Sequence, residues 1–376
     1  YVEKITPPGD AGSRVTTLGV TKLGWVTNIV YPNGTTNRFS FDPLGNVTNS
    51  VDTMGRVTRY AYLPTRKLSS VIRPLSSGAA LTNSVAYDNQ FNTLNLKDAK
   101  NRPVETYVLD LQDRVTSVTN LEAQTMGVSY GVAGFVKSVT RFDGTLVSNS
   151  YNGNGLVSSV TYPYSTNSFT YYSNSIMKTA ANEQGTVSNE VNFANRLSSA
   201  LSVVGGLSSV VSYVYWPAGQ VSNVVSLAGT NSYALDDADR LSSLSALRSQ
   251  LSAPLTFNYS YSSNNGLVSG ATCTNSGVFA QYGFDVMDRV TNIVWKNSAS
   301  NVLAGFAYSY NNASMITNVT LSGFRSEVSG FSYDDLDRLT GETRSGNQQY
   351  AISYGWDEVG NRLTKTNGDA TVNYTY

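Results

Sequence analysis

Two clusters of carboxylates offer the clearest opportunity for chemistry in this sequence. They consist of Asp236, Asp237 and Asp239, and of Asp334, Asp335 and Asp337. Closely spaced carboxylates could bind calcium or serve as an acid–base pair. Neither cluster has the spacing of an EF-hand loop. Aspartate also favours the first position of β-turns, so we interpret both clusters as turns and predict no metal or cofactor there.

Other catalytic groups are scarce. The chain has 376 residues, no histidine and one cysteine, Cys273. This composition excludes histidine-activated nucleophiles and the usual zinc sites. An internal disulfide is impossible, and we expect the Cys273 thiol to be buried and inert. The segments Asn152–Gly155 and Gly205-Gly206 lack the Gly-Lys-Ser/Thr ending of a phosphate loop and are interpreted as turns. We therefore predict no catalytic residue and no enzyme.

The overall composition narrows the class of protein. Formal net charge is zero and only 14% of residues are charged, which removes the basic surface that nucleic-acid binding requires. No apolar run approaches the roughly 18–20 residues that span a bilayer, so no membrane span is expected. The abundance of tyrosine, valine and threonine favours β-strands. The first residues do not resemble a signal peptide, and we expect both ends to be cuts within a longer protein.

A repeated motif organises the chain. Its template is Phe-Asp-Pro-Leu-Gly-Asn-Val-Thr at residues 41–48, whose residues are numbered below as positions 1 to 8. The clearest further copies begin at Leu109, Leu235, Phe284, Tyr333 and Trp356, the last with one extra residue. Degenerate copies begin near Val20, Tyr62, Tyr87, Tyr130, Tyr151, Tyr171, Val191, Tyr215, Tyr261 and Tyr310. The sequence is thus predicted to be a single array, 1–376, of about sixteen repeats of about 22 residues.

The Asp-x-x-Gly part of the motif has the chemistry of a turn, and position 5 is its most informative residue. Glycine, aspartate and asparagine tolerate left-handed backbone, so this set of residues predicts a positive φ at position 5. The residues at this position are Gly24, Gly45, Gly134, Gly155, Gly219 and Gly360, or Asp113, Asp239, Asp288, Asp337 and Asn195.

A second turn follows the motif turn after about ten residues in many repeats. A repeat therefore reads as turn, strand, turn, strand, with strands of about seven residues. The second turns include Pro7–Asp10, Asn33-Gly34, Asp52–Gly55, Asp143-Gly144, Gly205-Gly206, Gly229, Gly346-Asn347 and Asn367-Gly368. This alternation predicts antiparallel hairpins throughout and almost no helix.

Aromatic residues occur in pairs two residues apart just before the motif turns, as in Tyr60/Tyr62 and Tyr308/Tyr310. This spacing places both rings on one face of a strand. We expect the rings to form ladders across neighbouring strands, and the opposite face, rich in serine, threonine and asparagine, to meet water. Such rows of rings could also stack on sugars, which keeps carbohydrate binding open as an alternative function.

Two other folds fit the spacing less well. A β-propeller blade needs about 40–45 residues, which two repeats together would supply. The single repeat is nevertheless the clearer period. A parallel β-helix has coils of similar length but lacks tight turns every ten residues. Mostly parallel pairing would therefore contradict the hairpin interpretation.

The repeated Tyr/Phe-Asp-x-x-Gly-Arg/Asn-Val/Leu-Thr signature resembles the YD/RHS repeat family over nearly the whole chain. This resemblance implies an all-β fold in which tandem antiparallel hairpins form a spiralling, curved sheet, an open or partly closed shell. Family members include bacterial Rhs and wall-associated proteins, cocoon subunits of insecticidal toxin complexes and, more distantly, teneurins. Bacterial members usually have a closing segment rich in tyrosine and Asp-Pro, which in several members includes a self-cleavage site. No such segment is found here, and Asp42-Pro43, which lies in an ordinary repeat, is no substitute for it.

The resemblance also implies a function. We expect a structural shell segment that encapsulates or presents a C-terminal toxin or effector of the same polypeptide, in a secreted or cell-surface bacterial protein. The alternative is an extracellular adhesion module that binds a cell-surface glycan or protein through exposed aromatic rows. Neither interpretation requires a cofactor, a metal or a nucleic acid.

Overall fold

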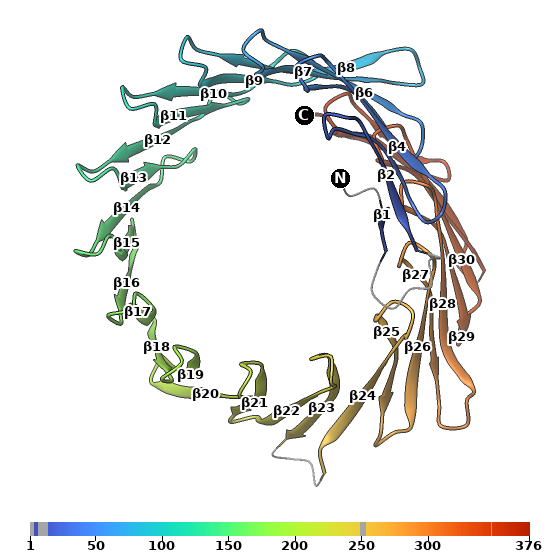
Figure 1. Cartoon of the computed structure of the whole chain (residues 1–376). Helices are drawn as coiled ribbons and strands as arrows, with labels where there is room; N and C mark the ends of the chain where they lie inside the picture. Colours follow the sequence, from blue (N-terminus) through green and yellow to red (C-terminus); the bar gives the residue numbers. More distant parts are fainter. Residues whose placement is uncertain (1–3, 7–13, 249–252, 347) are drawn as a thin grey trace. The chain divides into compact units, whose positions relative to one another are not determined.

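The fold consists of strands joined by short turns (Figure 1). The computed structural model describes residues 4–6, 14–248, 253–346 and 348–376. The expected turn at Pro7–Asp10, and Asn347 of the turn at Gly346-Asn347, lie outside these ranges. Within them there is no helix, and hence none long and apolar enough to cross a membrane.

The first half of the chain contributes seventeen of the strands. They are β1 (Lys4–Ile5), β2 (Thr16–Val20), β3 (Val26–Val30), β4 (Thr36–Phe41), β5 (Val47–Val51), β6 (Val57–Tyr62), β7 (Leu68–Pro74), β8 (Ala80–Tyr87), β9 (Thr93–Lys97), β10 (Pro103–Leu109), β11 (Val115–Asn120), β12 (Thr125–Tyr130), β13 (Val136–Thr140), β14 (Leu146–Tyr151), β15 (Val157–Tyr162), β16 (Ser165–Tyr171) and β17 (Met177–Asn182).

The second half contributes the remaining strands. They are β18 (Gly185–Val191), β19 (Leu197–Val204), β20 (Leu207–Tyr215), β21 (Val221–Ser226), β22 (Gly229–Leu235), β23 (Leu241–Arg248), β24 (Leu255–Tyr261), β25 (Val268–Cys273), β26 (Val278–Phe284), β27 (Val290–Lys296), β28 (Val302–Tyr310), β29 (Ile316–Gly323), β30 (Glu327–Tyr333), β31 (Leu339–Gly346), β32 (Tyr350–Trp356), β33 (Arg362–Asn367) and β34 (Ala370–Asn373).

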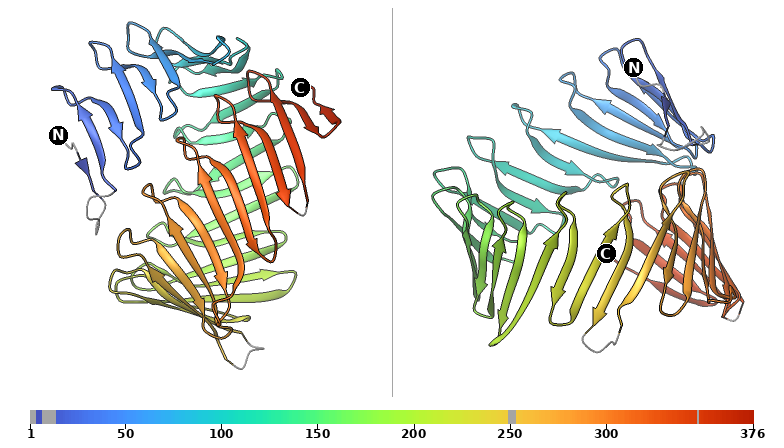
Figure 2. Two further views of the ribbon diagram at one scale, coloured as in Figure 1. Left: turned by 90° about the vertical axis from the view of Figure 1, so that its right-hand side faces the viewer. Right: turned by 60° about the horizontal axis from the view of Figure 1, so that its bottom comes forward.

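These 34 antiparallel strands form one unclosed sheet. The strand partners recorded in the described residues are consecutive in the chain, as in β14 with β15 and β15 with β16, where the arrows of neighbouring strands run in opposite directions (Figure 2). This pairing confirms the hairpin prediction. It excludes the parallel β-helix, and a single sheet of this size is not the set of separate four-stranded blades that a propeller requires.

Contacts along the chain divide the sheet into two compact units. The first unit contains residues 1–91, 96–102 and 259–376, and the second contains residues 92–95 and 103–258. Each unit is built from the same hairpin repeat, so the repeat is described first and the contacts within each unit follow.

The motif turn has the same backbone geometry in most repeats. In the template, the Asp42 N–H donates to the Asn46 carbonyl at 2.9 Å, and the Gly45 N–H donates to the Asp42 carbonyl at 3.1 Å. Gly45 has a φ of 86°. This is a type I turn followed by a left-handed residue, an arrangement common in hairpins with short loops. The register shifts at the same place, between Ser40 and Phe41, which marks a β-bulge.

Position 5 has a positive φ in all eleven repeats for which this was predicted. The glycines span φ values from 76° at Gly155 to 108° at Gly219, and the non-glycine residues lie near 60°, as at Asp113 and Asn195. The prediction from residue type is therefore confirmed. The copy at Trp356 has a turn of ordinary length, because the Asp357 N–H donates to the Asn361 carbonyl, as in the template.

The second turns use the same geometry or a tighter one. Gly34 and Gly55 have positive φ and close turns of the same length as the motif turn. Gly205 and Gly206 instead form a two-residue loop between β19 and β20, with φ values of 57° and 81°. Two consecutive positive φ angles are typical of a type I′ hairpin turn, which confirms that this glycine pair is a turn.

The sheet is a single layer with little buried core. Among the described residues, the buried apolar side chains are Leu81, Val118, Val147, Ala246 and Ala280, and no large side chain is fully buried. The accessible surface is 22393 Å². A compact chain of this mass would expose roughly 14,500 Å². Stability must therefore come from contacts between neighbouring hairpins, as in other repeat proteins.

The two faces of the sheet differ in chemistry. On β14–β16 one face carries cross-strand partners that are all hydroxyl residues, such as Ser148 with Thr161 and Ser159 with Ser168. The opposite face carries the motif tyrosines, such as Tyr151, which are half-buried. The expected separation into an aromatic face and a polar face is confirmed for these strands.

Two glycines allow the strain of the left-handed turn to be separated from packing. A Cβ at Gly45 would lie 2.8 Å from the ring of Trp25, whereas a Cβ at Gly34 would meet nothing within 4 Å. We predict that Gly34→Ala destabilises the protein by about 1 kcal/mol through backbone strain. Gly45→Ala should cost about 1–3 kcal/mol more because the Trp25 ring must move. Equal shifts of the urea midpoint, followed by circular dichroism, would contradict this.

Candidate functional site

In the motif turns that have an aspartate at position 2, the carboxylate accepts hydrogen bonds that close the turn. In Asp110, Oδ1 accepts hydrogen bonds from the backbone N–H groups of Gln112 and Arg114, at 2.9 and 3.0 Å. Its Oδ2 accepts a bond from Arg114 Nε at 2.8 Å. The carboxylate therefore closes the turn and fixes the side chain at position 6. Three equivalent bonds occur at Asp236, Asp285 and Asp334, and at Asp42 and Asp357, where the third donor is an asparagine Nδ2. Asp52 and Asp98 make the same three bonds in second turns.

This arrangement explains the carboxylate clusters found in the sequence. Asp236 and Asp334 each hold their own turn, and Asp239 accepts a bond from Gln220 Nε2 at 3.1 Å. Asp335 and Asp337 accept bonds from residues far away in the chain, which are described below. In the part of the chain that the structure describes, no group of three or more Asp, Glu, Cys or His side chains could hold a metal ion. The geometry favours the turn interpretation.

The turn bonds lower the pKa of several position-2 carboxyls, among them Asp110, Asp236 and Asp285. Hydrogen bonds from the side chains of Arg114 and Arg240 are the main reason that the pKa values of Asp110 and Asp236 lie below the ordinary value. At Asp285, burial would raise the pKa, but bonds from Arg289 outweigh it and the pKa is lowered. These carboxylates are thus held in their charged form by the fold.

Aspartate or asparagine at position 5 has a second task besides tolerating the left-handed backbone. Each accepts a hydrogen bond from a side chain outside its own turn. The bonds run from Asn92 to Asp113, from Asn174 to Asn195, from Gln220 to Asp239, from Arg14 and Asn265 to Asp288, and from Arg56 to Asp337. These bonds link one turn to another, which glycine at position 5 could not do.

Position 1 provides the strongest connection between successive repeats. The Tyr151 hydroxyl donates to the carbonyl of Val136, position 7 of the preceding repeat, at 2.8 Å. We call this bond the tyrosine clasp. The clasp also joins Tyr62 to Val47, Tyr87 to Leu68, Tyr130 to Val115, Tyr171 to Val157, Tyr215 to Leu197, Tyr310 to Val290 and Tyr333 to Ile316, and Trp356 Nε1 donates similarly to Leu339.

The side chain at position 6 covers the ring that makes the clasp. The Arg114 guanidinium carbon lies 4.3 Å from the centre of the Tyr130 ring, and Arg289 lies 4.6 Å from that of Tyr310. Where position 6 is aromatic, the two rings stack, as in Phe135 on Tyr151 at 4.8 Å. One repeat therefore holds the next by a hydrogen bond and by a covering side chain, which contribute independently.

The expected ladder of ring upon ring is wrong. Within the described residues, the ring–ring contacts recorded are Trp25 with Phe41 and Phe135 with Tyr151. Equivalent rings lie two strands apart, about 9.6 Å, which exceeds the 4.5–7 Å of direct aromatic contact. The side chain at position 6 fills that gap, and in most repeats it is not aromatic.

Three clasp tyrosines have hydroxyls whose pKa the fold raises. Burial raises the pKa of the Tyr62, Tyr310 and Tyr333 hydroxyls above the usual value. A raised pKa keeps the hydroxyl hydrogen in place, so each of these three groups continues to donate to its carbonyl.

Within the first compact unit, a row of turn-to-turn contacts joins residues 14–91 and 96–102 to residues 264–360. We call this row the seam (Figure 1). The Arg14 guanidinium binds the Asp288 carboxylate at 2.6 Å. Arg56 binds Asp337 at 2.5 and 3.1 Å, and Lys100 Nζ binds Asp357 at 2.7 Å. Each cation faces a motif turn of the C-terminal segment.

Hydrogen bonds with an uncharged donor lie between these ion pairs. The Ser76 N–H donates to Asp335 Oδ2 at 2.7 Å, and the Thr53 hydroxyl donates to the Asn312 carbonyl at 2.7 Å. At Asp357, burial would raise the pKa, but the bonds from Lys100 and Asn361 outweigh it and lower the pKa strongly. No residue pattern indicates the seam, because its partners are 250 or more residues apart.

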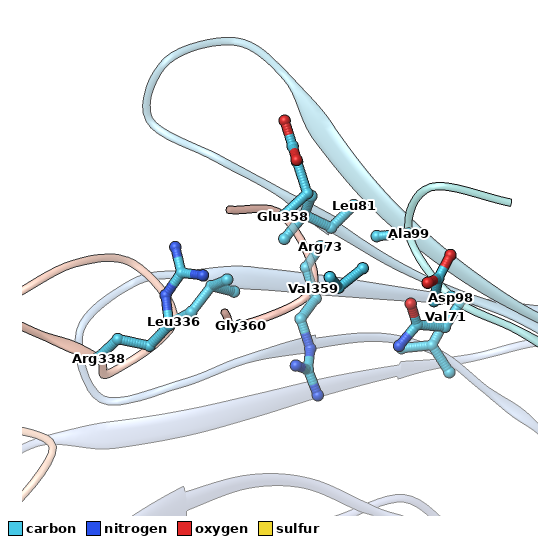
Figure 3. A pocket seen from close by; sticks show the side chains of 11 residues that line it. Val71, Arg73, Leu81, Asp98, Ala99, Leu336, Arg338, Glu358, Val359 and Gly360 are labelled. Atoms are coloured by element: carbon cyan, nitrogen blue, oxygen red, sulfur yellow. The ribbon is translucent and has the colours of Figure 1, made fainter. Parts of the chain in front are cut away.

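A cleft of about 190 Å³ lies on the seam. Figure 3 shows that its walls come from both segments: Arg73 and Leu81 belong to the N-terminal one, and Leu336, Arg338 and Val359 belong to the C-terminal one. A second cleft, of about 230 Å³, is lined by Asp52, Arg73 and Asp337 among others. Neither cleft contains a nucleophile with an adjacent base, and we see no catalytic arrangement in them.

Cys273, at the end of β25, is half-buried rather than buried as expected. Hydrogen bonding to Ser276 lowers the pKa of its thiol. The residue lies at a hairpin turn, where the two-sided exposure of a single-layer sheet leaves few positions deep enough to bury a thiol. The expectation of a core cysteine fails for this structural reason.

The fold has known counterparts among solved structures. A chain of the TcdB2–TccC3 crystal structure matches with a TM-score of 0.83 at 14% identity, covering 96% of this chain and 22% of that chain. A chain of the Photorhabdus luminescens Tc holotoxin pore matches with a TM-score of 0.83 at 13% identity over the same shares. A chain of the TcdB2–TccC3 structure without its hypervariable C-terminal region matches with a TM-score of 0.82 at 13% identity, again covering 96% of this chain and 22% of that chain.

These matches concern the fold. No protein-family model and no curated protein sequence matches this chain. The chain has the fold of these toxin-complex chains, which is the fold that the resemblance to the YD/RHS repeat family implies. It spans about a fifth of the length of the solved chains that it matches, 22% in each of the comparisons above.

The clasp can be tested by removing a single hydroxyl. Tyr333 donates to the Ile316 carbonyl at 2.8 Å, whereas Tyr164 is 98% exposed in a turn. We predict that Tyr333→Phe lowers the free energy of unfolding by about 1 kcal/mol, the typical net value of one hydrogen bond. Tyr164→Phe should stay within about 0.5 kcal/mol of the parent. Equal urea midpoints for both variants would refute the clasp.

The turn carboxylates predict a loss of stability in acid. Because the folded pKa values of Asp110, Asp236 and Asp285 lie below that of an unfolded aspartate near 3.9, the folded state binds fewer protons there. The stabilisation should be complete above about pH 5 and should decline as the pH falls through 4 toward the folded pKa values. Melting temperatures measured between pH 7 and pH 2.5 test this.

An asparagine substitution provides the matched control for the acid effect. Asn152 and Asn192 already occupy position 2 in other repeats and accept the same backbone bonds without titrating. Asp110→Asn with Asp236→Asn should therefore fold at pH 7 and lose less stability between pH 5 and pH 2.5. An unchanged acid profile would show that other groups dominate.

Proposed function

We propose that this chain is a wall segment of a protein shell, with a structural role and no catalytic one. The observation that carries the proposal is the clasp, because it recurs along the array and links a hairpin to the preceding repeat at nine junctions within the described residues. Such a chain gains stability in proportion to its length and builds a large surface without a thick core. This combination suits a container better than a catalyst.

The likeness to TcdB2–TccC3 chains supports this proposal. The matching fold covers nearly the whole chain, and one of the matched structures is a Tc holotoxin pore. We further propose that residues 1–376 form one repeat array within a longer polypeptide. The cargo would be a toxin or effector that belongs to the same polypeptide, and the protein would act as a secreted toxin or wall-associated component.

The absence of an enzymatic role is argued from the chemistry of the residues. Without histidine, activated nucleophiles of the usual kinds are missing. The position-2 carboxylates hold turns, and their lowered pKa values make them poor general acids near neutral pH. On the polar face of β14–β16, the hydroxyl groups lie opposite other hydroxyl groups and not opposite a base. The surface is suited to lining a space with uncharged groups.

Carbohydrate binding is the second candidate. It would need ring faces open to a sugar, whereas Arg114, Phe135 and Arg289 cover the rings of Tyr130, Tyr151 and Tyr310. Aromatic rings that are accessible to a sugar occur at exposed turn residues such as Phe193. A glycan array separates the two functions, because binding that disappears in Phe193→Ala would favour adhesion over containment.

The shell proposal is tested in the complete natural polypeptide. We predict that polypeptide enclosed by the array resists proteinase K until the repeats unfold, because a wall of hairpins excludes the protease. Resistance should be lost at the urea concentration that abolishes the strand signal in circular dichroism. A digest that removes every segment outside residues 1–376 while the array stays folded would contradict containment.

A further inference from the structure

We propose that the seam is a latch that can open. When it opens, the N-terminal segment of the first compact unit separates from its C-terminal segment, while the hairpins of both segments remain folded. The N-terminal segment comprises residues 14–91 and 96–102, and the C-terminal segment comprises residues 264–360. Opening would provide a gap in the wall without unfolding any repeat. This proposal goes beyond the structural role described above and is tested separately from it.

The first argument is that only turns meet across the seam. The strands in close backbone contact are consecutive in the chain, and none of β2–β8 lies within contact of β25–β34 in the described residues. Hydrogen bonds across the seam come from side chains or from one turn N–H, as at Ser76. No sheet ladder therefore has to break when the two segments part. The hairpins on either side keep all their backbone partners.

The second argument is the electrostatic nature of the contact. The seam pairs are Arg14–Asp288, Arg56–Asp337 and Lys100–Asp357, with all cations on one segment and all carboxylates on the other. The more exposed partner of each pair is Asp288 at 40%, Asp337 at 45% and Lys100 at 36%, whereas Arg14 and Asp357 are only 7% exposed. Because one partner of each pair faces solvent, salt can screen the attraction. Attraction between the cations of one segment and the carboxylates of the other favours the closed seam, and salt can weaken this attraction.

The third argument is imperfect packing. The clefts lined by Arg73 and Leu336 lie on the seam itself, between turns of the two segments. By contrast, successive repeats within one segment are joined by clasps and covering side chains, as at Tyr310 and Arg289. The seam is thus the weakest connection within the first compact unit. It is the place where that unit would open first.

The experiment uses fluorescence energy transfer across the seam in the full chain. Dyes are attached at Ser77→Cys, in the turn between β7 and β8, and at Asn312→Cys, in the turn between β28 and β29, with Cys273→Ser to remove the native thiol. We expect transfer to fall as NaCl rises from 0.05 to 1 M, while circular dichroism stays constant. The fall in transfer measures the decrease in the fraction of molecules whose seam is closed.

Charge variants identify the contacts responsible. In Arg14→Gln/Arg56→Gln/Lys100→Gln, the ratio of closed to open seams should fall about tenfold at 0.15 M NaCl, the combined effect of three weak pairs. The control Arg38→Gln/Arg59→Gln/Lys365→Gln removes three cations of the same unit that lie outside the seam and should leave transfer unchanged. Both sets have the same net charge.

Three results would overturn the latch. Transfer that stays high in the seam variant at every salt concentration would show that other contacts hold the segments together. Transfer lost only where circular dichroism is also lost would show that opening requires unfolding. An equal loss in the control variant would show a general effect of charge. None of these results bears on whether the array encloses a cargo, so the shell proposal is judged separately.

Discussion

The bond between the position-2 carboxylate and its own turn sets the geometry on which the rest of the fold depends. In accepting two backbone N–H groups, Asp110 fixes the turn, and in accepting Arg114 Nε it fixes the side chain at position 6. That side chain then lies over Tyr130, whose hydroxyl reaches Val115 at position 7. A local turn thus determines where the next repeat docks.

A single-layer sheet must obtain its stability in this way. With few buried side chains, hydrophobic burial per residue is limited, and each added hairpin contributes a clasp and a covered ring instead of a share of a central core. Most of the contacts are local in sequence, which favours folding by propagation from one repeat to the next. The seam is different, because its partners meet only after many hairpins are in place.

Residue types predicted the local structure well and the long-range structure poorly. The positive φ at Asp288 and Asp337 follows from which residues tolerate left-handed backbone, so the turn geometry was readable. The ring ladder was misjudged because the sequence shows the spacing along one strand, not the two-strand distance between Tyr130 and Tyr151. The link from Arg56 to Asp337 was not predictable, since an arginine and an aspartate 281 residues apart carry no sign of contact.

The acceptor of the clasp is a main-chain oxygen, and this has an evolutionary consequence. Any apolar residue at position 7 presents the same carbonyl, as Val136, Leu68 and Ile316 do. Mutations there leave the bond intact, so sequences can drift while the architecture persists, in keeping with a shared fold at 14% identity. Because the clasped junctions are alike, a copy between two of them can be duplicated or deleted without redesigning its neighbours. The array can therefore change length by gene rearrangement and remain a foldable chain.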